Sequence, residues 1–172
     1  MAAEQDNLKK LLEIYRNRLK ILIDFKALSL RISGEIEAKG EDAADAVDEL
    51  TEKREALLEK IKEADMAARY CESLLGRNYK TVLSEVKSAV KAGKPAEFKP
   101  GWAAYLYKNF TEYKSVSGSI RENDAKNQAA VKALMEAMKS KLEAVKANKK
   151  MMDKFSDGLD RPSVGTLMNE KK

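Results

Sequence analysis

The chain has 172 residues, of which 35% are charged and 44% hydrophobic, and its formal net charge is +5. This length and composition predict a strongly charged helical protein, one domain or one elongated unit, that can bury a continuous core. The chain has no histidine and a single cysteine. Histidine-based catalysis, an intrachain disulfide and a thiolate zinc cluster are therefore excluded.

Targeting and membrane signals are missing from the sequence. No stretch approaches the roughly 18 consecutive apolar residues of a membrane span. The first ten residues, MAAEQDNLKK, lack the basic and then apolar order of a secretory signal. We therefore expect a cytoplasmic protein without stable membrane insertion.

The first helix is expected at about 6–39, with apolar residues three and four apart on one face. That face is made of Leu8, Leu11, Leu12, Tyr15, Leu19, Leu22, Ile23, Leu28, Ile32 and Ile36. Gly40 follows it and is typical of a glycine in the left-handed conformation that ends a helix. So short a connection predicts that the next helix is an antiparallel neighbour.

The second helix is expected at about 42–75, and it carries a long apolar stripe that only Arg54 interrupts. The stripe is Val47, Leu50, Leu57, Ile61, Ala64, Ala68, Cys71 and Leu75. Cys71 lies on this line, which favours a small buried side chain over a reactive thiol. A helix of this length spans roughly 50 Å, so its stripe must pack against other long helices or a partner.

Two shorter helices are expected next, at about 78–92 and 102–116, separated by residues that include Gly93, Pro95 and Pro100. An aromatic cluster covers residues 98–113. It is consistent with base stacking in nucleic acid, but its spacing on one helical face favours core or interface packing. The run Ser117-Gly118-Ser119 predicts the end of the fourth helix.

The last long helix is expected at about 120–155, followed by a flexible tail at 156–172. Its stripe is Ile120, Asp124, Asn127, Val131, Leu134, Met138, Leu142 and Val145. The polar residues Asp124 and Asn127 on this line either fix the register of this helix against its neighbours or lie where water has local access. The fold class predicted from these elements is all-α: an elongated antiparallel helical bundle, or coiled-coil-like hairpin, with a long C-terminal helix.

Charge and methionine concentrate on this last helix. Between Lys126 and Lys154 there are eight lysines against three acidic residues, and their difference equals the whole net charge of +5. These lysines fit a solvated surface, or a basic face for an acidic partner, an anionic membrane or nucleic acid. The methionines Met135, Met138, Met151 and Met152 fit either gap filling in a core or an adaptable binding surface.

Nothing in the sequence indicates catalysis. The glycines are too far apart for a dinucleotide or phosphate loop, and the carboxylates are scattered along helix surfaces. We therefore expect a protein that is not an enzyme and that binds no cofactor and no metal.

Two parts of the chain resemble FlgN-type flagellar export chaperones. Residues 8–66 resemble their amino-terminal antiparallel helix pair, with the segment L-x-x-x-R/K-E-x-L-L-x-x-I at Leu50 to Ile61. Residues 120–155 are similar to the carboxy-terminal helix of this group and of FliT-type chaperones, through Asp124, Asn127 and Phe155 with the lysine pair before it. The middle, 79–117, is longer than in the family and carries the Pro/Gly break and the aromatic cluster.

The resemblance implies a cytoplasmic, non-enzymatic chaperone that binds helical termini of hook-associated or filament-cap proteins and delivers them to the export gate. No nucleic acid partner is expected, and the choice between a monomer and a homodimer is left open. The expected client or gate surface, with two lysines steering the partner, is Met135, Met138, Leu142, Val145, Lys149, Lys150, Met151, Met152 and Phe155.

Two other classes remain open at this point. One is a structural coiled-coil adaptor or oligomerisation module with no export role, which predicts a permanent parallel dimer through the 47–75 stripe. The other is a binder of anionic membranes or nucleic acid, which predicts salt-sensitive binding through the late lysines.

Overall fold

The computed structural model describes residues 2–159, with side chains described over 3–153, and this part of the chain is built from helices. Helix α1 is Ala2–Lys39, the 3-10 turn η1 is Gly40–Ala43, α2 is Ala44–Ser73, α3 is Arg77–Ala92 and α4 is Gly101–Leu159. The predicted all-α bundle with a long C-terminal helix is confirmed. Contacts divide the chain into two units, Met1–Val131 and Lys132–Lys172. The single domain predicted over 1–155 has its packed helices in the first unit.

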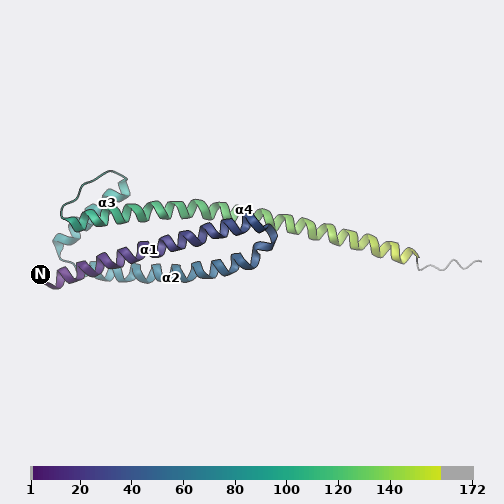
Figure 1. Cartoon of the computed structure of the whole chain (residues 1–172), viewed down its shortest axis with the longest axis horizontal. Coiled ribbons are helices and arrows are strands. Elements are labelled where there is room, and N and C mark those ends of the chain that lie inside the picture. The colour runs from purple at the N-terminus through teal and green to yellow at the C-terminus, as the bar shows by residue number, and fades with distance from the viewer. Residues whose placement is uncertain (1, 160–172) are drawn as a thin grey trace, which may run out of the picture. The chain divides into compact units, whose positions relative to one another are not determined.

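Helices α1 and α2 form an antiparallel hairpin within the first unit (Figure 1). Gly40 begins the turn between them with φ of 55°, in the left-handed region that the sequence predicted for it. The stripe is buried at Leu50, Ile61, Ala68 and Cys71 within α2, and at Leu75 just past its end. The hairpin forms because two long apolar faces, joined by a short turn, cover each other.

The first part of α4 lies beside this hairpin as the third long helix (Figure 1). The amide of Asn109 contacts the backbone oxygen of Tyr15, and the amide of Asn123 contacts that of Ser29. The residue number rises along α1 and along α4 in the same direction from one contact to the next. Helix α4 therefore runs parallel to α1 and antiparallel to α2.

Two clusters of buried side chains hold the first unit together. The larger joins all four helices through Leu8, Leu11, Tyr15, Ala68, Cys71, Leu75, Leu83, Val86, Ala103, Leu106 and Phe110. The smaller joins α1, α2 and α4 through Leu22, Ile61 and Ile120. Aromatic residues pack in pairs against the larger cluster, as Phe98 does with Tyr107 at 5.5 Å between ring centres. Most of the aromatic segment therefore packs in or against the core, as its spacing favoured, and Tyr105 is exposed.

The break predicted at Ser117-Gly118-Ser119 is wrong, because α4 continues through it as one helix. Glycine inside a helix costs about 1 kcal/mol relative to alanine, and serine costs less. Packing on both sides outweighs this cost: Val116 packs against the smaller cluster, and Ile120 is buried in it. The expected helices at 102–116 and 120–155 are thus one element.

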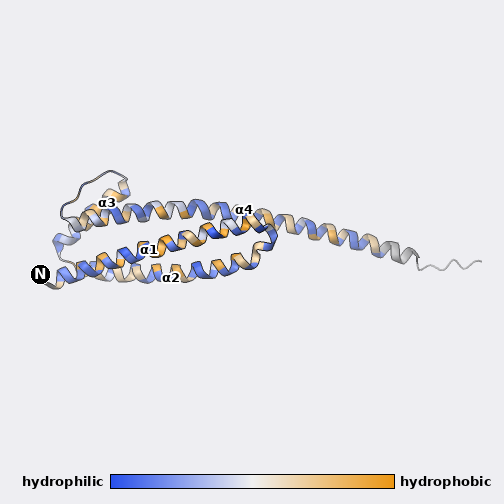
Figure 2. Cartoon of the chain, in the orientation of Figure 1, coloured by the Kyte–Doolittle hydropathy of each residue, from blue (hydrophilic) through white to orange (hydrophobic). Residues whose placement is uncertain are grey.

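The start of the first helix and the end of the last helix also differ from expectation. Helix α1 begins at Ala2 rather than near residue 6, and α4 extends to Leu159, so 156–159 are helical rather than a tail. Residues 160–172 of the predicted tail lie outside the described residues. Hydrophobic residues recur at intervals along α1, α2 and α4 between hydrophilic ones (Figure 2), as expected for helices that bury one face.

Candidate functional site

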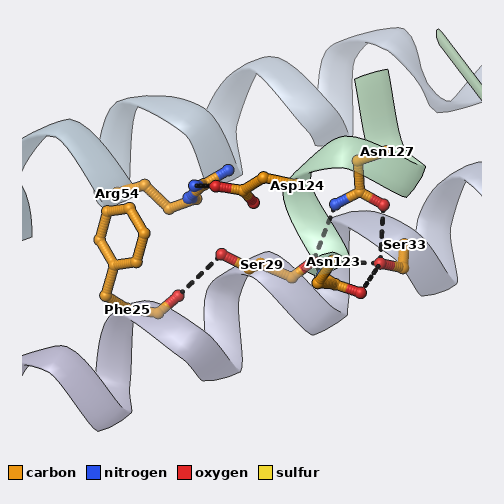
Figure 3. Close-up of polar contacts among 7 residues, drawn as sticks. All are labelled: Phe25, Ser29, Ser33, Arg54, Asn123, Asp124 and Asn127. Atoms are coloured by element: carbon orange, nitrogen blue, oxygen red, sulfur yellow. Dashed lines mark hydrogen bonds and ion pairs between the residues drawn. The ribbon is translucent and has the colours of Figure 1, made fainter. Parts of the chain in front are cut away.

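A layer of polar side chains fastens α4 to α1 (Figure 3). Asn127, buried on α4, donates its amide hydrogen to the backbone oxygen of Ser29 at 3.1 Å and accepts a hydrogen bond from the Ser33 hydroxyl at 2.7 Å. Asn123, one turn earlier, donates to the same Ser29 oxygen at 2.9 Å. A shift of α4 along α1 would leave these buried groups unpaired, which opposes any other register.

An ion pair fastens the same part of α4 to α2. The Arg54 guanidinium donates to the Asp124 carboxylate at 2.6 Å and lies 4.4 Å from the centre of the Phe25 ring (Figure 3). Arg54, which interrupts the stripe of α2, and Asp124, one of the two polar residues on the stripe of α4, are therefore partners. Of the two explanations for Asp124 and Asn127, these contacts favour fixed register.

The predicted client surface lies further along α4, within the second unit, where the chain is helical, and those of its side chains that the structure describes are exposed. The exposed fractions are 65% for Met135, 49% for Met138, 55% for Leu142, 62% for Val145, 56% for Met151 and 72% for Met152. Apolar side chains so exposed on a helix mark a candidate binding surface.

Helical geometry brings most of these residues onto one face. At about 100° per residue, Met138, Leu142 and Val145 fall within one narrow arc, and Met135 and Met152 flank it. We call these five residues the late stripe. Met151 falls on the opposite side of the helix, so it is separated from the others, contrary to its place in the predicted surface.

Lysines border the late stripe. Lys149 lies within its arc, while Lys139, Lys146 and Lys150 follow one of its edges, and Lys149 and Lys150 are both exposed. The stems of such lysines extend the apolar surface while their ammonium groups stay in water. The surface thus combines adaptable apolar contact with positive charge along its edge.

Phe155 belongs to the backbone of α4, but its side chain lies outside the described residues. Among the side chains described, those of residues 3–153, no group of three or more acidic, cysteine or histidine residues is placed to hold a metal ion. The described helices also include none with the length and apolar character needed to cross a membrane.

Comparison of the chain with protein-family models, curated proteins and solved structures finds no match.

Proposed function

We propose that this chain is a helix-binding chaperone whose late stripe receives an amphipathic helical segment of another protein. The observation that carries the proposal is the exposure of Met138, Leu142 and Val145 on one face of a helix, between about half and two-thirds of each side chain. An unpartnered stripe of this kind suits side-by-side packing with a second amphipathic helix. The methionines allow it to accept segments of different shape.

The resemblance to FlgN-type and FliT-type chaperones supplies the proposed class of client. The clients are the helical termini of hook-associated or filament-cap proteins, delivered in the cytoplasm to the flagellar export apparatus. These termini are disordered when free, so ordering them offsets part of the binding free energy. Moderate affinity, with Kd on the order of micromolar, permits release at the export gate.

The main alternative, a parallel dimer through the 47–75 stripe, has less support. Ile61, Cys71 and Leu75 of that stripe are buried in clusters with other helices of the same chain. A second copy would have to displace these contacts. An adaptor function would therefore have to use another surface.

The test compares two triple variants of the full chain in calorimetric titrations with terminal segments of hook-associated proteins from the same cell. Met138→Ser/Leu142→Ser/Val145→Ser alters the late stripe, and Ala137→Ser/Ala144→Ser/Met151→Ser is the matched control on the opposite face. Losing about 1 kcal/mol of apolar burial per residue should weaken binding by the stripe variant about 100-fold. The control should bind as the unmodified chain does.

Two results would contradict the proposal. One is equal affinity of the stripe variant and the unmodified chain. The other is the absence of binding by the unmodified chain to every terminal segment offered. Circular dichroism of both variants checks that the helices are retained.

A further inference from the structure

A pocket of about 530 Å³ opens in the first unit, where all four helices contribute to its wall. It lies within residues 1–131 and is independent of the late stripe and of the chaperone proposal. Its floor is apolar, because Tyr15, Ala68 and Phe110 are almost completely buried there. The pocket size falls in the range typical of small-molecule sites, about 300–1,000 Å³.

Positive charge prevails on the pocket wall: five basic and two acidic side chains line it. Both carboxylates are already paired with a basic neighbour in the pocket. Asp65 accepts from Arg18, and Glu72 accepts from Lys87 at 2.7 Å. No acidic side chain of the pocket therefore remains to neutralise the other three basic side chains.

Arg69, Lys91 and Lys114 have no carboxylate partner among the described residues, and Arg69 and Lys91 are exposed at the rim. Lys114, the fifth basic side chain, is engaged differently. It donates to the backbone oxygens of Val90 and Lys91 at 3.0 and 3.3 Å, at the end of α3. An anion entering the pocket would thus meet Arg69 and Lys91 as its available partners.

Aromatic rings shape the interior. The Arg18 guanidinium carbon lies 4.0 Å from the Tyr113 ring centre and 5.0 Å from that of Tyr15, and the Tyr15 and Phe110 rings meet edge to face at 4.7 Å. Burial also raises the pKa of the Tyr113 hydroxyl, which fits a poorly hydrated interior. Such walls favour a flat apolar body over a hydrated ion.

We propose that this pocket binds a small organic anion in which a carboxylate or similar group is joined to an aromatic ring. The ring enters against Tyr15, Phe110 and Tyr113, and the charged oxygens lie at the rim between Arg69 and Lys91. Inorganic anions have no apolar group to pack against the floor of the pocket. Neutral aromatic molecules have no negative charge to pair with the basic side chains at the rim.

The test uses 2-naphthylacetate and its neutral analogue 2-naphthylacetamide, each titrated into the full chain and followed by two-dimensional NMR. We expect the acid to bind about tenfold more tightly than the amide, the preference that two exposed cations typically provide. Resonances of residues in the pocket should shift, and those of the late stripe should not.

Charge variants locate the site. Arg69→Gln/Lys91→Gln should bring the affinity for the acid down to that for the amide, and Arg69→Glu/Lys91→Glu should reduce it further. The matched control, Lys60→Glu/Lys108→Glu, makes the same change in net charge at exposed lysines outside the pocket and should keep the preference. These side chains are all exposed, so the fold should be retained.

Three outcomes would overturn the proposal. The first is equal affinity of the unmodified chain for acid and amide, including no binding of either. The second is an equal loss of binding in the control variant. The third is a clear preference for the dipeptide Ac-Asp-Phe-NH2 over the free acid, which would assign the pocket to a protein segment instead.

Discussion

Asn127→Ala is the substitution that most directly probes how α4 is held in the bundle. The amide of Asn127 takes part in two hydrogen bonds, a buried one to the Ser29 backbone and a partly buried one from the Ser33 hydroxyl. Each is worth about 0.5–1.5 kcal/mol net, so their loss should destabilise the chain by about 1–3 kcal/mol. Ser33 can still donate to Asn123 at 3.1 Å, which favours the lower half of that range.

The assay is urea unfolding followed by circular dichroism at about 222 nm, a wavelength at which helices give a strong negative signal. Asn17→Ala is the matched control, because Asn17 lies inside α1 with its side chain exposed. Both substitutions gain the same helix propensity, about 0.5 kcal/mol, so the difference between them isolates the buried contacts. If Asn127→Ala loses no more stability than Asn17→Ala, the polar layer does not fasten α4.

The other predictions concern single contacts in the first unit. A double-mutant cycle of Arg54→Ala and Asp124→Ala, measured by urea unfolding, should give a coupling of about 1–2 kcal/mol, because the pair is only partly exposed; additive effects would refute it. Burial and the neighbouring Glu72 raise the pKa of Tyr15 above its usual 10.0, so the folded chain holds this proton more tightly than the unfolded chain. Stability should therefore fall as pH rises above about 10, and the fall should be shallower in Tyr15→Phe by up to about 1.4 kcal/mol per pH unit; equal slopes would refute this. The buried thiol of Cys71 should react with a disulfide reagent only after denaturant is added, and immediate reaction would show that it is accessible.

Much of the fold could be predicted from the sequence because burial follows the helical period. The apolar line through Leu50, Ile61 and Cys71 and the glycine turn at Gly40 lie where their spacing and chemistry indicated. The break near Gly118 failed because local propensity is worth about 1 kcal/mol, and packing of distant residues can exceed it.

The pairing of Arg54 with Asp124 shows where sequence reasoning stopped. Each residue stood out as polar on an apolar line, but 70 positions separate them. The antiparallel course of α4 beside α2 brings them together, and nothing in the local pattern fixes that course. The pocket was missed for a related reason: its charged and aromatic residues come from four helices and resemble ordinary surface positions in each one.

The candidate binding surface was predicted in part. The periodic positions Met138, Leu142 and Val145 share a face because the chain there is helical, as expected. Met151 was grouped with them by composition alone, and the helical period separates it. Composition identifies which residues concentrate in a segment, whereas geometry decides which of them one partner can touch at once.

Amide hydrogen exchange of the full chain, with and without a terminal segment of a hook-associated protein, tests the central claim most directly. The account predicts that added protection appears in residues 132–153 and that exchange in α2 stays as it was. Protection confined to other helices, or no change in 132–153 under conditions where the segment is bound, would contradict it.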